Sequence, residues 1–290
     1  MFSIDEKAQE QLEQGAVQMG FELSEQQVSL MCRYLELLHR WSRLFNLTGV
    51  PPNKWIAKHL LDSLSACQFM PKAGQEMRCI DIGSGAGLPG IPLAIAMNPT
   101  YQQTSQATSQ PEVDPTSTVA SSAASSDASP AVNWYLLEKS TKKCGFLLRV
   151  KAELGLDNIN VVNTSAENLN LLLRKMRSHS NDKPQASATT DNENAAAKAA
   201  LLKQEREVAF GGKLPAVFDL AIGRSIFGSD GLLEHCHPML KDDGVILDMH
   251  GKYSGKPQDR EQWRVDKFEK VRVPYLQESR HIIRWVKLSS

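Results

Sequence analysis

Several features that would assign this chain to a common class of proteins are missing from its sequence. Its 290 residues contain no uninterrupted apolar run near the ~20 residues of a membrane-spanning helix. The five cysteines are odd in number and form no Cys-x-x-Cys pair, which argues against a disulfide framework and a zinc site. No charged and then apolar leader opens the chain. We therefore expect a cytoplasmic protein with reduced, buried thiols and no metal ion.

The sequence also lacks a net charge of one sign. Its 33 basic and 33 acidic residues balance, so the total neither demands nor excludes a nucleic-acid partner. The segment 252–290 is locally basic, whereas 1–30 is acidic. The basic segment is a candidate surface for phosphate, and a solvated charged face is the alternative.

Two stretches have too little apolar content to order themselves. Residues 100–131 are rich in Ser, Thr and Gln, and residues 178–214 are rich in Ala, Asn, Lys and Gln. Such compositions are typical of flexible segments, so we predict surface insertions at both places. The second could be partly helical around 195–208.

The remaining sequence predicts an N-terminal helical unit over 1–70 followed by one α/β domain over 71–290. In the helical unit, an apolar stripe runs from Leu30 to Phe45 behind a capping box at Ser24 and Gln27, and a second helical stretch covers 55–69. Beyond it, strand-like and helix-like segments alternate, which favours a mostly parallel sheet with a C-terminal antiparallel hairpin. One expected strand ends at Ile82, and the others cover 134–137, 159–162, 217–222, 245–249, 271–275 and 282–288. The expected helices cover 141–154, 166–176 and 231–240.

The most informative segment is the glycine-rich stretch IDIGSGAGLPGIP over 80–92. An apolar run, closely spaced glycines and a new apolar segment predict a strand, a tight turn and a helix. The stretch fits G-x-G-x-x-G, so an enzyme with a nicotinamide or flavin dinucleotide is one interpretation. A P-loop is excluded, because no Gly-Lys-Ser/Thr follows.

Two acids help to choose the ligand of this loop. Asp81 would repel a pyrophosphate at the helix N-terminus, but it would favour the sulfonium and ammonium groups of S-adenosylmethionine. Accepting hydrogen bonds from the loop backbone is its alternative role. Without 100–131, Glu138 follows Asp81 by about 25 residues, roughly where a Rossmann-type acid binds ribose hydroxyls. A solvated acid or a partner of Lys142 is the alternative for Glu138.

The motifs taken together resemble a known family. They are NLT (46–48), KHLLDS (58–63), DIGSGAGLPGIPL (81–93), Phe218-Asp219 with Arg224, and Arg280-His281. In this order they are similar to glucose-inhibited division protein B, the bacterial small-subunit ribosomal RNA guanine-N7 methyltransferases. The resemblance implies a class I methyltransferase fold and S-adenosylmethionine as cofactor. It also implies that the substrate is a guanosine in the decoding region of the small-subunit (16S) ribosomal RNA. We expect the chain to act as a monomer.

The same resemblance implies site residues. It assigns cofactor contacts to the loop, to Ala166 and Glu167, and to Arg224, with Glu138 at the acidic position. Arg224 is the expected orienting residue at the reacting atoms, and a surface ion pair is its alternative. Thr164 and Glu167 also have the spacing of a capping box. The complete predicted cofactor set is Asp81, Gly83, Ser84, Gly85, Gly87, Leu88, Glu138, Ala166, Glu167 and Arg224.

The chemistry that the resemblance implies asks little of the protein. Guanine N7 is a bare acceptor, so no general base is expected, and the target base should be unpaired when it reacts. Ser165 and His250 depart from the family pattern, which has Arg and Lys there. A methyltransferase for another RNA site or a small molecule, and a binding protein without catalysis, therefore stay as alternatives. Candidate phosphate contacts are Arg40, Arg43, Lys58, Lys139, Lys142, Lys143, Arg149, Lys252 and Arg280.

Overall fold

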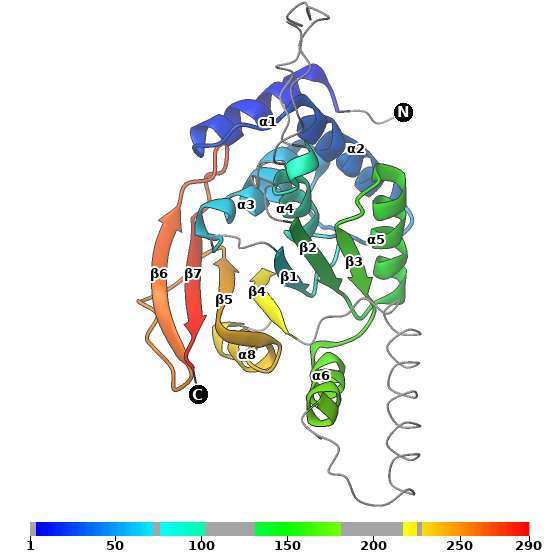
Figure 1. The fold of residues 1–290 in the computed structure, drawn as a ribbon. Helices are drawn as coiled ribbons and strands as arrows, with labels where there is room; N and C mark the ends of the chain where they lie inside the picture. Colours follow the sequence, from blue (N-terminus) through cyan, green and yellow to red (C-terminus); the bar gives the residue numbers. More distant parts are fainter. Residues whose placement is uncertain (1–3, 72–75, 102–130, 181–216, 225–227, 290) are drawn as a thin grey trace, which may run out of the picture.

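The computed structural model describes residues 4–71, 76–101, 131–180, 217–224 and 228–289, with the backbone alone over 175–180. Within them, one sheet has the strand order β3-β2-β1-β4-β5-β7-β6 (Figure 1). Strands β1 to β5 are parallel, and β7 is antiparallel to both β5 and β6. The strands are β1 (Glu76–Ile82), β2 (Ala131–Leu137), β3 (Ile159–Val162), β4 (Phe218–Arg224), β5 (Leu240–His250), β6 (Trp263–Val271) and β7 (Arg280–Lys287).

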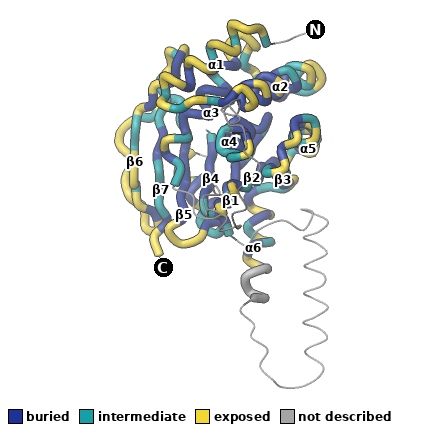
Figure 2. The backbone as a smooth tube through the Cα atoms, turned by 45° about the horizontal axis from the view of Figure 1, so that its top comes forward, coloured by how far each residue is buried: buried dark blue, intermediate teal, exposed yellow. Residues whose placement is uncertain are grey.

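Helices cover both faces of this sheet. Successive strand residues point to opposite sides, and here both sides carry apolar side chains that must be buried. Cys79 and Trp134 pack into one apolar cluster, and the adjacent Ile80 and Tyr135 pack into the other. The first cluster includes α4 (Gly90–Ala96) and α5 (Thr141–Leu154), and the second includes α6 (Ala166–Ser180) and α8 (Gly228–Cys236) (Figures 1 and 2). The predicted mostly parallel sheet with a C-terminal antiparallel hairpin is confirmed.

The N-terminal helices pack on the same face as α4 and α5. They are α1 (Glu6–Gln18), α2 (Glu25–Ser42), η1 (Pro52–Lys54), η2 (Ile56–Leu61), α3 (Asp62–Leu64) and η3 (Cys67–Phe69). Their apolar side chains share one cluster with Met77 and Cys79 of β1. The boundary between a helical unit over 1–70 and a domain over 71–290 stays a prediction.

Details of these helices partly correct the sequence interpretation. The capping box of α2 is confirmed, with Ser24 and Gln27 bonded to each other's backbone. The helix ends before the predicted stripe does: α2 ends at Ser42 and Leu44 is 73% exposed, although Phe45 packs against the same apolar cluster. Helix α1 carries no strong apolar stripe that would predict it, since its buried residues are only Leu12, Gly15 and Ala16.

At the C-terminal end, the predicted strand 271–275 is wrong. The strand before β7 is β6, which ends at Val271, and a turn follows in which the Leu276 amide donates to the Val273 carbonyl, 3.2 Å away. The pairing of β6 with β7 shifts between Val265 and Lys267, which interrupts the alternation of apolar and polar residues. The predicted helix 231–240 extends too far: α8 ends at Cys236, and Leu240 is already the first residue of β5. The predicted insertions at 100–131 and 178–214 lie mainly outside the described residues.

The thiols are buried as expected. All five cysteines are free, with Cys67 half-buried and the others buried. Burial raises the pKa of Cys144 to about 11 and that of Cys32 to about 12, so both remain protonated at neutral pH.

In the described part of the chain, no helix is long and apolar enough to cross a bilayer.

Candidate active site

The predicted site residues line up along the carboxyl edge of the sheet. Ile82 pairs with Leu137 of β2 and with Gly223 of β4. The next residues of the three strands are Gly83, Glu138 and Arg224, so the loop glycine lies between the acid and the arginine. The strand order reverses direction here, between β1 and β4, and ligands of open α/β sheets bind at such a point.

Glycine is required where the loop passes close to its neighbours. Gly87 has φ +90°, and a Cβ atom there would lie 2.2 Å from Ile91 Cδ1. A Cβ atom on Gly90 would lie 2.4 Å from Leu136 Cδ2 and 2.7 Å from Asp81 Oδ2. Contacts below about 3 Å do not occur without movement, so these glycines let α4 begin directly against β1 and β2.

The rest of the loop is held by hydrogen bonds to the neighbouring elements. The Ser84 amide donates to the Leu137 carbonyl (2.9 Å), and the Ser84 hydroxyl donates to the Asp81 carbonyl (3.2 Å). From α2, the Tyr34 hydroxyl donates to the Ala86 carbonyl (2.8 Å). The predicted cofactor residues Ser84, Gly85, Gly87 and Leu88 thus shape the loop. None of the four lines the cavity that opens beside the loop, over the ends of β1, β2 and β3.

Asp81 lies beneath this loop, and one of its two carboxylate oxygens accepts a hydrogen bond from the loop backbone. Its Oδ2 accepts a hydrogen bond from the Gly90 amide at 3.0 Å, as the backbone alternative for this residue supposed. Its Oδ1 is buried and has no hydrogen-bond partner among the described residues. Burial raises the pKa of Asp81 to about 6. A buried acid with an open acceptor is the arrangement that a nearby cation would stabilise.

Glu138 is buried and joins the loop to β2. Its Oε2 accepts from the Gly85 amide (2.9 Å), and its Oε1 accepts from the Ser140 amide (2.8 Å). Neither alternative holds, because the carboxylate is neither a solvated group nor a partner of Lys142. A carboxylate has about four lone-pair positions, so two acceptor positions remain for hydroxyl groups of a ligand.

A cavity of about 370 Å³, which we call the donor cavity, opens over the ends of β1, β2 and β3. Four of the predicted residues line it: Gly83, Glu138, Ala166 and Glu167. Its size lies within the usual range for small-molecule sites. Its other lining residues are Ile82, Leu137, Lys139, Lys143, Thr164 and Ser165.

At the start of α6 the expected capping box is not formed. The cap is Ser165, whose hydroxyl oxygen accepts from the Asn168 amide at 3.3 Å. Glu167 is left exposed, and a hydrogen bond from Ser165 holds its pKa below the ordinary value. Its Oε1 lies 3.5 Å from His235 Nε2 of α8, and the carboxylate is an anion at the donor cavity.

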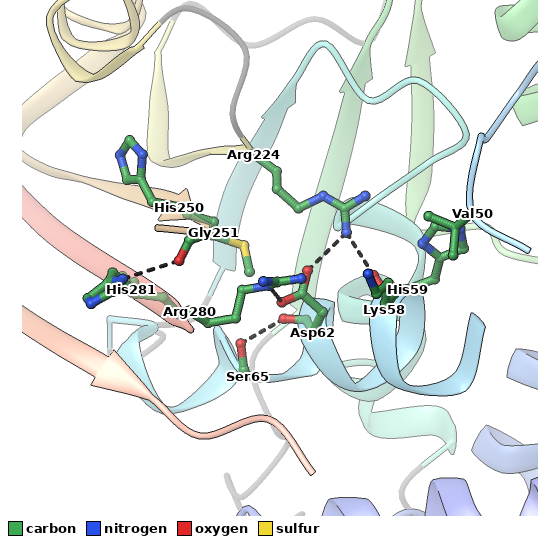
Figure 3. A pocket seen from close by; sticks show the side chains of 12 residues that line it. Val50, Lys58, His59, Asp62, Ser65, Arg224, His250, Gly251, Arg280 and His281 are labelled. Atoms are coloured by element: carbon green, nitrogen blue, oxygen red, sulfur yellow. Dashed lines mark hydrogen bonds and ion pairs between the residues drawn. The ribbon is translucent and has the colours of Figure 1, made fainter. Parts of the chain in front are cut away.

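A second cavity of about 260 Å³, the acceptor cavity, lies on the β4 side of β1, over the ends of β4 and β5 and the start of β7. Asp62 connects its two arginines: Asp62 Oδ2 lies 3.2 Å from Arg224 Nη1, and Asp62 Oδ1 lies 2.6 Å from Arg280 Nε (Figure 3). The Asp62 side chain is 4% exposed. Arg224 therefore belongs to a largely buried network, and the surface ion pair considered for it is wrong.

The floor of the acceptor cavity comes from η2, a π-helical turn of a kind that often occurs at functional sites. It carries Lys58 and His59 and leads directly into Asp62. His59 Nε2 lies 2.9 Å from Thr48 Oγ1, which joins the NLT and KHLLDS motifs in space. Burial, with Arg224 nearby, lowers the pKa of His59 to about 4, so the ring is neutral at physiological pH.

His250 closes β5 and also lines the acceptor cavity. Its Nε2 lies 2.8 Å from Asp248 Oδ2 and 3.2 Å from Ser229 Oγ, so the ring is held by its own strand and by α8.

The candidate basic residues divide between the two cavities. Lys58 and Arg280 line the acceptor cavity, and Lys139 and Lys143 line the donor cavity. Arg149 is paired with Glu153 along α5. The other four line neither cavity: Arg40, Arg43, Lys142 and Lys252. Sequence reasoning missed Asp62, although it lies within a motif quoted for the resemblance.

The strand order with an antiparallel β7, the glycine loop after β1 and the acid after β2 define a class I S-adenosylmethionine-dependent methyltransferase fold. A family model for rRNA small subunit methyltransferase G (GidB) matches residues 27–104. Over these residues the chain is similar to that family.

Relatives with that name show how far the likeness extends. Ribosomal RNA small subunit methyltransferase G of Ectopseudomonas mendocina (strain ymp) is 36% identical over 166 residues, covering 57% of this chain and 62% of that protein. The Pseudomonas entomophila (strain L48) protein is 38% identical over 54% of this chain and 58% of its own length. These alignments span less than two thirds of either relative. The Salmonella schwarzengrund (strain CVM19633) protein is 26% identical over 91% of both chains.

Proposed function

We propose that the protein transfers a methyl group from S-adenosylmethionine to N7 of a guanosine in the decoding region of 16S ribosomal RNA. The observation that carries this proposal is that two cavities of different chemistry lie on either side of the carboxyl end of β1, one over β2 and β3 and the other over β4 and β5. The donor cavity would hold the cofactor, and the acceptor cavity would hold the target base. The relatives' names supply the small-subunit RNA, and the family resemblance supplies the atom and the region.

The donor side fits S-adenosylmethionine better than a dinucleotide. Glu138 has acceptor positions free for ribose hydroxyls, and Asp81 and Glu167 add negative charge nearby. The negative charge of these acids would repel a pyrophosphate and attract the sulfonium and ammonium groups. The bound cofactor would supply an electrophilic methyl group on sulfur.

The acceptor side needs to orient the base rather than remove a proton. With the cofactor bound, the N7 lone pair would form the new bond to the methyl carbon, sulfur would keep the electrons of the broken carbon–sulfur bond, and the positive charge would pass to the base. No proton leaves in this step, so a neutral His59 is no obstacle. Arg224 and Arg280, held by Asp62, can donate hydrogen bonds to guanine O6 or to the flanking phosphates. Positioning then accounts for most of the rate acceleration.

The RNA must present this guanosine extruded from any helix, because the N7 edge is inaccessible in the deep groove of A-form RNA. Lys58 at one cavity and Lys139 and Lys143 at the other would contact the flanking phosphates. We propose that the enzyme acts as a monomer in the cytoplasm, where its ribosomal substrate would be found.

The test is transfer of a labelled methyl group to unmodified small ribosomal subunits and to their stripped RNA, followed by chemical cleavage at N7-methylguanosine. We expect one modified guanosine in the decoding region. Modification at another position or atom would contradict the proposal. A lack of transfer to both substrates, with S-adenosylhomocysteine still raising Tm, would favour a methyltransferase for another substrate.

A further inference from the structure

A polar groove adjoins the acceptor cavity. It has a volume of about 510 Å³ and lies between α1, η1, η2 and the loop that joins β6 to β7. Lys58 lines both the groove and the acceptor cavity. A nucleotide chain leaving the acceptor cavity past Lys58 would therefore enter this groove, which we call the flanking groove. Its other lining residues are Gln11, Asn53, Lys54, Ala57, Tyr275, Leu276, Gln277 and Glu278.

An aromatic residue stands in this groove at a backbone position that suits glycine. Tyr275 is the third residue of the turn closed by Val273 and Leu276, it follows Pro274, and it has φ +61°. Turns of this shape favour Gly or Asn there, and another residue raises the energy of the fold. Burial of the ring does not compensate, because Tyr275 is 48% exposed. Among the described residues, its hydroxyl has hydrogen-bond contacts only with Gln14 and Gln18, both long at 3.4 Å.

Lys58, which lines both the groove and the acceptor cavity, forms an exposed ion pair with Glu278. Lys58 Nζ lies 2.5 Å from Glu278 Oε1, and the two side chains are 25% and 50% exposed. The hydrogen bond from Lys58 keeps the pKa of Glu278 below its ordinary value, so the carboxylate is charged at neutral pH. Exposed ion pairs contribute little stability, so a phosphate could take the place of this carboxylate. Lys54, also exposed, adds a second positive charge to the groove.

From the shared lysine, the exposed ring and the replaceable carboxylate, we propose that the flanking groove binds the nucleotide next to the target guanosine. Its base stacks on Tyr275, and its phosphate binds Lys58 and Lys54 after Glu278 is displaced. Aromatic side chains bind unpaired bases in this way without reading their sequence. The inference rests on the proposed function, since it assumes that an RNA base occupies the acceptor cavity.

The first test separates the ring of Tyr275 from the backbone. Tyr275→Ala should weaken binding to stripped, unmodified small-subunit RNA by about ten-fold in a filter assay, the range for losing one base stack. Tyr275→Phe, which keeps the ring, should bind within about two-fold of the wild type. Tyr275→Gly removes the ring and relieves the backbone, so it should bind RNA as weakly as the alanine variant without a lower Tm.

The second test looks for a gain of affinity. Glu278→Gln frees Lys58 from its partner and removes a negative charge, so RNA should bind about two- to three-fold more tightly, as expected when a weak exposed ion pair is lost. If the pair were only structural, this substitution would leave RNA affinity unchanged or lower it.

The third test measures the phosphate contact through its salt dependence. Lys54→Gln should weaken RNA binding and reduce the slope of log K against log salt by roughly 0.7 to 0.9, the value for one phosphate contact. The matched control is Lys241→Gln. Lys241 is exposed, lies near the start of β5 and therefore at the amino edge of the sheet, and is paired there with Asp219. The control should leave both affinity and slope unchanged.

The outcomes distinguish this inference from the function on which it rests. Methyl transfer by the wild type with unchanged RNA affinity in Tyr275→Ala, Lys54→Gln and Glu278→Gln would overturn the flanking groove alone. A wild type that neither binds nor methylates small-subunit RNA would overturn both. Weaker binding by the first two variants, tighter binding by the third and unchanged S-adenosylhomocysteine affinity in all three would establish the groove.

Discussion

The two cavities beside Gly83 are built in different ways. The donor cavity consists mainly of residues that directly follow β1, β2 and β3, and its shape is fixed by backbone hydrogen bonds and close glycine contacts. The acceptor cavity brings together Arg224 of β4 and Arg280 of β7, which are far apart in the sequence, around the carboxylate of Asp62. Changes on the donor side should therefore affect cofactor binding, and changes on the acceptor side should affect the transfer step.

The sharpest test of this division is Asp62→Asn, for which we expect the largest effect. The substitution keeps the size of the side chain but leaves Arg224 and Arg280 without their shared anion. We expect kcat for methyl transfer to fall about 100-fold, the scale on which misplaced orienting groups act. Affinity for S-adenosylhomocysteine should stay within about three-fold, measured by calorimetry.

The control for Asp62→Asn is Asp230→Asn, which breaks an exposed pair with Arg260 and should leave kcat unchanged. A parallel loss of S-adenosylhomocysteine affinity in Asp62→Asn would show that the two cavities are not separate.

On the donor side, Gly90→Ala should lower the free energy of unfolding by about 1 to 3 kcal/mol through overpacking against Leu136 and Asp81. Denaturant unfolding measures this change, and the Tm shift on adding S-adenosylhomocysteine should shrink as well. Gly145→Ala in α5 is the matched control, because nothing lies within 4 Å of its added Cβ atom. That variant should be more stable by up to about 1 kcal/mol, and equal destabilisation of both would count against the close contact.

Glu138→Ala should weaken S-adenosylhomocysteine binding about ten-fold, because the ribose would lose its acceptor and the Gly85 amide would lose its partner. At saturating cofactor, kcat should change little. Glu138→Asp keeps the charge and should retain most of the affinity in the same titration. A fall in kcat alone would place Glu138 on the acceptor side instead.

The smallest expected effect is a pH dependence through Asp81. Because its pKa rises from 3.8 to about 6 on folding, the folded chain binds this proton more tightly, and stability without ligand falls as pH rises from 3.8 to about 6. A bound ammonium group favours the carboxylate, so S-adenosylhomocysteine affinity should increase about three- to five-fold between pH 5 and 7. Asp81→Asn should flatten this profile, and an unchanged profile would remove Asp81 from the site.

The contrast between the cavities also explains what the sequence could predict. The glycine loop, Glu138 and Arg224 were predictable, because each follows a recognisable strand and parallel strands bring their carboxyl ends together. The bonds made by Asp62 were not predictable, because they depend on how the start of α3 lies against Arg224 of β4 and Arg280 of β7. The turn at Tyr275 was assigned to a strand for a related reason: its apolar neighbours fit a strand, whereas its positive φ is visible only in the fold.

The most direct measurement is a crystal structure of the protein with S-adenosylhomocysteine. The two-cavity account predicts ribose hydroxyls within hydrogen-bonding distance of Glu138, the adenine beside Ala166, and the sulfur at Gly83 facing Arg224. An adenosyl group in the acceptor cavity, among Asp62, Arg224 and Arg280, would contradict it.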